Sequence, residues 1–142
     1  MLQPGEGHNL DLRGNLASFK AVAATTSGRF SLMERVVPVG GRTPPPHVHV
    51  DRVEAFYVLS GELEFRLDDA SELGVSGSFV LVPGGVAHTF TNVGTSEARV
   101  LILHAPAMDA YFEELSALWR GADPPSPEAE RDLMRRHGME PV

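Results

Sequence analysis

Three histidines and one glutamate form the chemically most informative pattern in the sequence. His47 and His49 make a His-x-His pair, Glu54 follows five residues later, and His88 comes 39 residues after His49. Residues i and i+2 of a strand share a face, so both imidazoles of the pair would point the same way. Three imidazole nitrogens and one carboxylate oxygen suit one divalent transition-metal ion, whether Fe, Mn, Ni, Co, Cu or Zn. On a six-coordinate ion they leave two positions, for a substrate and for water or dioxygen.

The chain must turn to bring Glu54 onto the face of the two histidines. An odd separation would put Glu54 on the opposite face of one continuous strand. We therefore expect a turn or bulge at Asp51-Arg52, after which Glu54 opens the next strand and faces back. His88 follows another turn, predicted at residues 83–85 by a Pro-Gly-Gly sequence.

Short β-rich segments separated by turn residues fill the chain from about residue 16 to 105. Residues 60–61, Ser-Gly, predict a two-residue hairpin turn between the segments Val53–Leu59 and Glu62–Leu67. Many short strands at close spacing predict an all-β sandwich or barrel. The candidate strands are Leu16–Ala24, Phe30–Val37, Val53–Leu59, Glu62–Leu67, Phe79–Val82, Thr89–Val93 and Arg99–Leu103.

The two ends of the chain have a different texture. Residues 1–15 are polar and predict an arm or edge strand. Residues 106–142 predict a helical tail, with a first helix over Asp109–Trp119 that carries an aromatic and leucine stripe. A second helix is expected from Ser126, as N-cap, to about His137.

Two longer motifs enclose the four proposed ligands. Residues 41–61 read G-x5-H-x-H-x4-E-x6-G, and residues 77–92 read G-x5-P-x-G-x2-H-x3-N. Both resemble the signature motifs of the cupin superfamily, and residues 56–63 with the flanks resemble its quercetin dioxygenase-like members. The resemblance implies a small antiparallel jelly-roll barrel of six to eight strands. It also implies a metal held inside by His47, His49, Glu54 and His88, and a homodimer.

Further residues are candidates for a substrate pocket above the metal. Glu54 is the candidate catalytic base, acting by shifting off the metal. His104 ends an apolar segment and either serves the site as an outer or proton-transfer group or is a hydrogen-bonded structural residue. Asn92 either binds turn backbone or contacts substrate. The expected pocket-lining residues are Phe56, Tyr57, Phe79, Phe90, His104 and Met33, with Phe56 and Tyr57 on alternate faces.

Several functions are compatible with these motifs. The first is a metal-dependent dioxygenase acting on a small enolic or aromatic substrate; a metal-dependent isomerase or decarboxylase is its variant without oxygen consumption. The second is a non-catalytic module that binds a small molecule. The third is a storage protein, which the retained ligands and the length of a single barrel disfavour. The helical stripe and the polar arm either pair across a dimer or pack on their own barrel.

Composition excludes other classes of protein. The 142 residues are 42% hydrophobic and 22% charged, typical of one globular domain. The absence of cysteine excludes disulfides, thiolate metal sites and a cysteine nucleophile. A net charge of −7 disfavours nucleic acid as a partner. No long apolar run or leader is present, so we expect neither membrane association nor a signal peptide, and a cytoplasmic protein.

Overall fold

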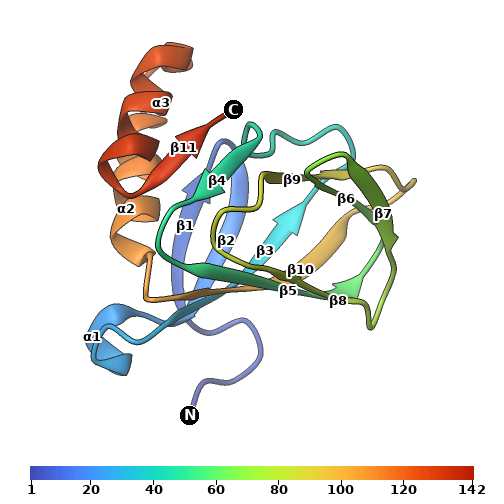
Figure 1. The fold of residues 1–142 in the computed structure, drawn as a ribbon. Coiled ribbons are helices and arrows are strands. Elements are labelled where there is room, and N and C mark those ends of the chain that lie inside the picture. The colour runs from blue at the N-terminus through green and yellow to red at the C-terminus, as the bar shows by residue number, and fades with distance from the viewer.

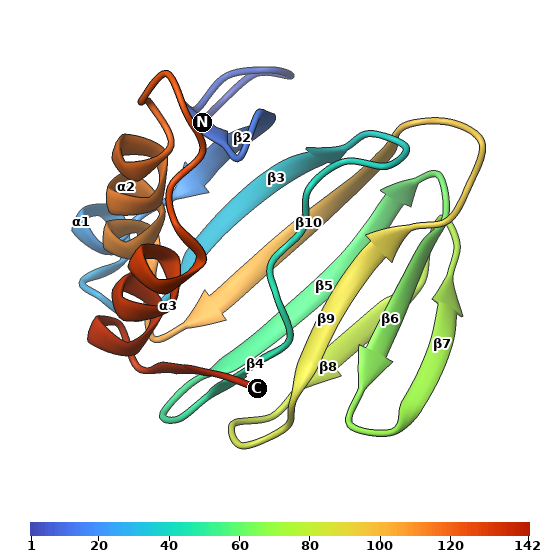
Figure 2. The ribbon, with the colours of Figure 1, turned by 90° about the horizontal axis from the view of Figure 1, so that it is seen from above.

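Two antiparallel sheets face each other in the computed structural model of the protein, which describes residues 1–142 (Figures 1 and 2). The six-stranded sheet has the order β1 (His8–Leu12), β2 (Asn15–Ala21), β3 (Ser31–Val37), β10 (Ala98–Ala105), β5 (Val53–Ser60), β8 (Phe79–Val82). The five-stranded sheet has the order β11 (Met139–Pro141), β4 (His47–His49), β9 (His88–Asn92), β6 (Leu63–Leu67), β7 (Ala70–Gly74). This architecture confirms the predicted jelly-roll fold, with more strands than the six to eight expected.

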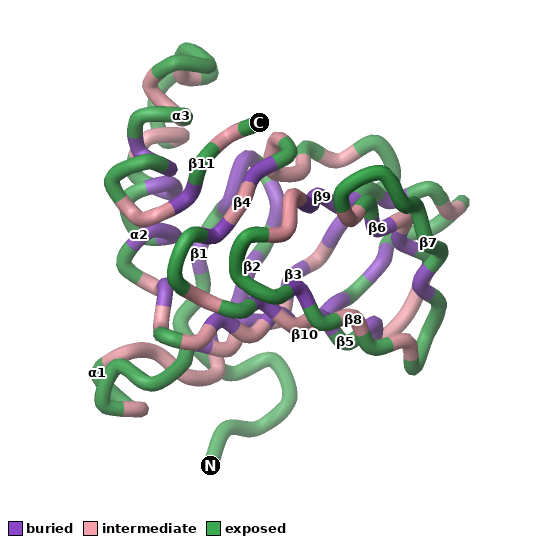
Figure 3. Tube along the Cα trace, in the orientation of Figure 1, coloured by how far each residue is buried: buried purple, intermediate pink, exposed green.

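The core lies between the sheets because alternate side chains of each strand point inward. Along β3 every second residue is buried, and β10 repeats this pattern. Three rings from both sheets meet in the middle: the centroid of Phe56 lies 5.1 Å from that of Phe65 and 5.5 Å from that of Phe90. Figure 3 shows the buried positions recurring along the strands that line the interior.

The predicted hairpin around residues 60–61 is wrong. β5 pairs with β10 and β8, whereas β6 pairs with β7 and β9, so the chain passes from one sheet to the other at this point. Gly61 has φ of +79°, and a Cβ there would lie 2.7 Å from the Cα of Ala98. The glycine therefore serves a close approach at a corner between the sheets.

Two helices follow β10, as predicted, and lie beside the barrel. α2 (Asp109–Leu118) buries Tyr111, Phe112 and Leu115, and the ring of Phe112 lies 5.8 Å from that of Phe19 in β2. α3 (Pro127–Arg136) begins at Ser126, whose hydroxyl accepts a hydrogen bond from the Ala129 backbone N–H at 3.2 Å. The aromatic stripe therefore packs on its own barrel, which is one of the two alternatives left open.

Shorter elements complete the chain. α1 (Ala23–Thr26) occupies the end of the segment 16–24 that was expected to be entirely strand. After α3 the chain turns back, and β11 pairs with β4 at the edge of the five-stranded sheet (Figure 1). No helix has both the length and the apolar character that crossing a membrane requires.

Candidate metal centre

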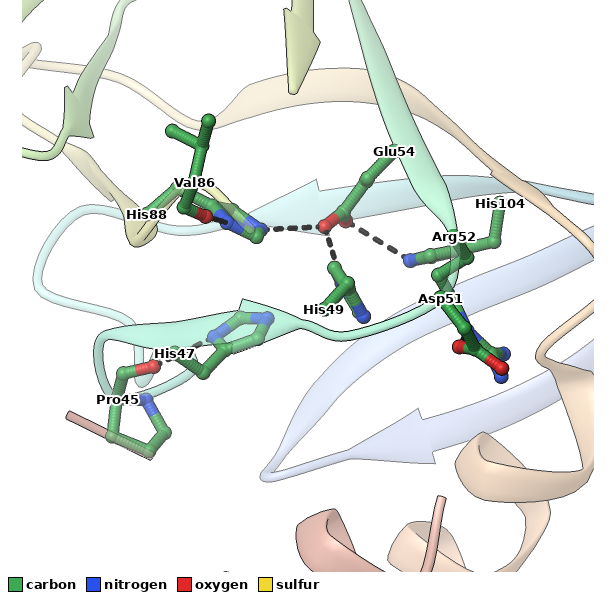
Figure 4. Close-up of polar contacts among 9 residues, drawn as sticks. All are labelled: Pro45, His47, His49, Asp51, Arg52, Glu54, Val86, His88 and His104. Atoms are coloured by element: carbon green, nitrogen blue, oxygen red, sulfur yellow. Dashed lines mark hydrogen bonds and ion pairs between the residues drawn. The ribbon is translucent and has the colours of Figure 1, made fainter. Parts of the chain in front are cut away.

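The four proposed ligands meet inside the barrel from three different strands. β4 supplies His47 and His49, β5 supplies Glu54, and β9 supplies His88, which is the register partner of His47. The chain turns over residues 50–52, so that Glu54 faces the two histidines (Figure 4). One potential ligand atom from each residue lies within 4.8 Å of all the others, and all four residues are buried.

Backbone carbonyl groups orient two of the imidazoles. Nδ1 of His47 lies 2.9 Å from the Pro45 carbonyl oxygen, and Nδ1 of His88 lies 3.0 Å from that of Val86. A carbonyl oxygen only accepts, so Nδ1 carries the proton and donates it in both rings. Nε2 is then the nitrogen left to bind a metal, which is how metal-binding histidines are usually fixed; in His88 it would first have to release the proton that it donates to Glu54.

The Glu54 carboxylate is the centre of the hydrogen-bonded cluster. Its Oε2 lies 2.9 Å from Nε2 of His49 and 2.7 Å from Nε2 of His88. Its Oε1 lies 3.0 Å from Nε2 of His104, which faces Glu54 across the β5–β10 pair (Figure 4). Burial alone would raise the pKa of Glu54, but the charge of His104 and the hydrogen bonds from the three histidines hold it well below its usual value. The carboxylate is therefore ionised and acts as an acceptor.

The histidines differ in how readily they take up a proton. Burial lowers the pKa of His47 to about 3, so its imidazole is neutral at physiological pH. Burial also lowers the pKa of His49, against the opposing effect of Glu54. For His88 burial is outweighed by the hydrogen bond and charge of Glu54, which raise its pKa above 6.5. At least two of the rings are thus held in the neutral form that binds a metal.

The donor set fits a first-row divalent ion. Neighbouring ligands of one ion, each about 2.1 Å from it, lie about 3 Å apart, and Glu54 Oε2 lies at such a distance from the Nε2 atoms of His49 and His88. Nδ1 of His49 is buried without a hydrogen-bond partner, so the polar atoms of this cluster are not fully satisfied by the protein alone.

The predicted pocket residues fall into two groups. Met33, Phe90 and His104 line a cavity of about 20 Å³ together with His47, His49 and Glu54. Phe56 does not line this cavity and is buried in the ring cluster with Phe65 and Phe90. Tyr57 and Phe79, in contrast, are 45% and 64% exposed on the outer face of the six-stranded sheet and do not line this cavity.

Asn92 has a structural place. Its side-chain amide donates to the carbonyl groups of Val37 at 2.7 Å and Ser96 at 2.9 Å, and its oxygen accepts from the Gly94 N–H at 2.9 Å. These backbone contacts occupy both ends of the side chain. Asn92 therefore fixes the turn after β9, as the first of the two interpretations has it.

Sequence reasoning missed several residues of the cavity wall. Arg35 lines it from β3, and Tyr111 and Phe112 line it from α2. The position of Arg35 could have been found from the sequence, because Arg35 shares one face of the predicted strand with the apolar residues Met33 and Val37. The aromatic and leucine stripe of α2 was recognised in the sequence, but nothing in the spacing of Tyr111 and Phe112 indicates that these two side chains line the cavity.

A family model described as "Cupin domain" matches residues 33–104. Quercetin 2,3-dioxygenase of Bacillus subtilis (strain 168) is 34% identical over 92 residues, which are 63% of this chain and 26% of that protein. Oxalate oxidase GF-3.8 of Triticum aestivum is 32% identical over 104 residues, 67% of this chain and 46% of that protein. The chain thus spans less than half the length of these two relatives.

Among solved structures, KdgF from Halomonas sp. matches with a TM-score of 0.67 at 18% identity, covering 78% of this chain and 97% of that chain. This likeness concerns the fold.

Proposed function

Because the chain belongs to the cupin family, we propose that His47, His49, Glu54 and His88 hold one divalent transition-metal ion and that the protein is a metal-dependent enzyme. The observation that carries this proposal is the convergence of four buried ligand atoms within 4.8 Å. The reaction we propose is dioxygenase-like oxidation of a small enolic or aromatic substrate inside the barrel. The likeness to quercetin 2,3-dioxygenase and to oxalate oxidase supports oxygen-dependent chemistry.

A bound ion of this kind supplies Lewis acidity toward oxygen atoms of the substrate. The residues of the chain supply the rest. Glu54 is ionised and can take the proton of an enolic hydroxyl group at Oε2, the oxygen that faces His49 and His88. His104 holds the other oxygen, Oε1, at 3.0 Å and so keeps the carboxylate oriented. Met33, Phe90 and Phe112 surround the site with apolar surface that excludes water.

The metal site is tested first by metal content. Elemental mass spectrometry of the wild type is compared with the double variant His47→Ala/His49→Ala and with a control, His8→Ala/His137→Ala, which removes two histidines outside the site. We expect about one ion per chain in wild type and control, and roughly a tenfold loss or more in the site variant. If none of Fe, Mn, Ni, Co, Cu and Zn binds after reconstitution, the metal site is refuted.

Oxygen uptake then separates the remaining candidate functions. Metal-loaded protein is screened against enolic and phenolic compounds with an oxygen electrode, and products are followed by mass spectrometry. Substrate-dependent uptake supports the dioxygenase. Turnover without uptake assigns the isomerase or decarboxylase alternative, and tight ligand binding without any product assigns the non-catalytic binding module.

We make two further proposals, on the oligomeric state and on the location of the protein. The first is a homodimer, supported by exposed apolar side chains that gather on the outer face of β5 and β8: Val53, Tyr57, Phe79 and Leu81. The second is a cytoplasmic location, which stays a prediction of the sequence. A small-molecule ligand is the expected partner.

A further inference from the structure

Arg35 places a positive charge in the interior of the barrel. It lies on the inward face of β3, where Ser31, Met33 and Val37 are its neighbours at every second position, and only 2% of its surface is exposed. It is the largest of the fully buried side chains. Charged side chains are rarely buried to this extent unless they are paired, because removing a charge from water is costly.

The guanidinium group of Arg35 is poorly satisfied by the protein. One hydrogen bond leads from Nη2 to the Arg42 carbonyl oxygen at 3.3 Å, and Nε has no partner. Arg35 forms no ion pair, since no carboxylate oxygen lies within 4.0 Å. The ring of Phe90, whose centroid lies 5.4 Å from Cζ, is in cation–π range, and Glu54 and Glu130 attract the charge from beyond ion-pair distance. Burial accordingly lowers the pKa of Arg35 to about 9, which still leaves it charged at physiological pH.

The neighbouring charged groups are already committed to other partners. Arg13, which lines the same cavity, is paired with the Glu130 carboxylate through Nε at 2.7 Å and through Nη2. Glu54 is engaged by His49, His88 and His104. Arg35 thus remains as the buried cation without a counter-ion.

Arg35 and the proposed metal ligands share one cavity. The wall formed by Arg35 is continuous with that formed by His47, His49 and Glu54. Once a divalent ion is bound, its two charges are only half neutralised by Glu54, and Arg35 adds a further positive charge. The interior then carries an excess of positive charge in a poorly solvated space, where electrostatic attraction is strong.

We propose that Arg35 binds an anionic group, a carboxylate, of the molecule whose other oxygen atoms face the metal, so that the substrate is a small organic acid. This inference rests on the proposed function and narrows its substrate class. A guanidinium presents its donors in a planar fork that matches a carboxylate. The free Nε–H and the little-used Nη groups of Arg35 are therefore suited to this role.

The ligand must displace part of the cavity wall. A volume of about 20 Å³ holds roughly one water molecule. Two methionines, Met108 and Met139, line the cavity beside Tyr111 and Phe112. Methionine side chains repack easily, so this part of the wall can yield to a small acid.

The experiment measures binding of malonate and of malonamide, its uncharged diamide, to protein loaded with redox-inactive Zn²⁺. Isothermal titration calorimetry is carried out on wild type, on Arg35→Met, and on Arg29→Gln as a control that removes an exposed arginine. We expect the affinity for malonate to fall by roughly tenfold or more in Arg35→Met and to be unchanged in Arg29→Gln. The affinity for malonamide should be the same in Arg35→Met as in wild type.

Thermal unfolding without ligand provides a second readout. A binding role predicts that Arg35→Met is at least as stable as wild type, because an unpaired buried charge has been removed. A purely structural role predicts loss of stability with unchanged malonate affinity, which would overturn the inference. If Arg35→Met does not fold, Arg35→Lys replaces it: this variant keeps the charge but loses the fork, and we expect weaker malonate binding.

Metal analysis of the same samples separates the two proposals. Wild type that is fully loaded with Zn²⁺ but binds no malonate, or binds it equally well without Arg35, overturns the inference alone. Wild type that takes up no metal overturns the proposed function. The inference is then decided on metal-free protein, by whether the increase in melting temperature caused by malonate requires Arg35.

Discussion

The Glu54 carboxylate shows how the site is built at the scale of single residues. Its two oxygens have different neighbours: Oε2 faces the proposed metal ligands His49 and His88, and Oε1 faces His104. His104 therefore contacts the carboxylate of a proposed metal ligand, and this contact agrees with both interpretations of the residue, as an outer group of the site and as a hydrogen-bonded structural histidine. Its spacing from the motifs could not indicate this, because the contact arises from the pairing of β10 with β5. Arg35 shares one face of the predicted strand with Met33 and Val37, but its burial and its lack of a counter-ion are properties of three-dimensional packing.

Acidification should destabilise the metal-free protein through His47. Its pKa is about 3 in the folded state, whereas the unfolded chain takes up this proton near pH 6.5. Between these values the unfolded state binds more protons, so the free energy of unfolding falls as the pH falls, by up to about 1.4 kcal/mol per pH unit for this group. His88, whose pKa is raised, acts in the opposite sense: its stabilisation is present below pH 6.5 and is lost as the pH rises through the folded value.

Urea unfolding between pH 6 and pH 4 measures this effect. We expect the decline in stability with falling pH to be less steep in His47→Gln than in wild type, and unchanged in the control His8→Gln, whose imidazole is exposed. Equal slopes in all three proteins would contradict the burial of a neutral imidazole at position 47.

At the scale of elements, the short strand β11 supports the strand that carries two proposed ligands. β11 pairs with β4 so that Met139 lies opposite His49 and Pro141 opposite His47. Further backbone hydrogen bonds of 3.0 Å join Val50 to Gly138 and Val142 to Pro46 on either side. β4 is only three residues long, so a large part of its edge is held by the C-terminal segment.

Replacing Met139 should therefore weaken the barrel more than replacing its neighbour. Met139 is 2% exposed and lines the cavity, whereas Glu140 on the same strand is exposed. We expect Met139→Ala to lower the free energy of unfolding by about 2–5 kcal/mol, and Glu140→Ala to change it by less than about 0.5 kcal/mol. Urea denaturation checks both values. Similar stability of the two variants would show that β11 contributes little to the core.

The predictability of the elements follows from where their specifying contacts lie. Long strands such as β3 and β5 and both long helices carry their own periodic pattern or cap, and their positions were predicted within a few residues. β11 has three residues and is defined by its partner β4, so no local pattern could reveal it. The corner at Gly61 resembles a hairpin turn in sequence, because a glycine with positive φ serves both. Only the choice of pairing partners distinguishes the two.

At the scale of the whole molecule, the two faces of the six-stranded sheet differ in what they do. Its inner face supplies Glu54, Arg35 and His104 to the cavity. On its outer face, Tyr57 lies opposite Phe79 in the β5–β8 pair, and both are exposed. Exposed apolar side chains gathered in one place are typical of a surface that binds a partner. The aromatic stripe of α2 was the other candidate for such a surface, but it is buried against the protein's own barrel.

A homodimer formed through this outer face should be disrupted by charge. We expect wild type to sediment as a dimer and the variant Phe79→Glu/Leu81→Glu as a monomer, because two carboxylates would have to be buried without partners. Leu73→Glu, at an exposed position of β7 in the other sheet, is the control and should remain dimeric. Analytical ultracentrifugation over a range of concentrations decides this, and a wild type that stays monomeric throughout would contradict the proposal.

The pairing of β4 with β11 has a consequence for the order in which the molecule is made. Ninety positions separate His49 from Met139, its partner across this pair. During synthesis the other strands of the barrel emerge before β11, so the backbone groups on the outer edge of β4 stay unpaired until β11 has been made. An open edge is a template for pairing with other chains. The nascent protein is therefore most exposed to misassociation in the interval just before its C-terminal segment docks, and rapid docking protects both the barrel and the histidines within it.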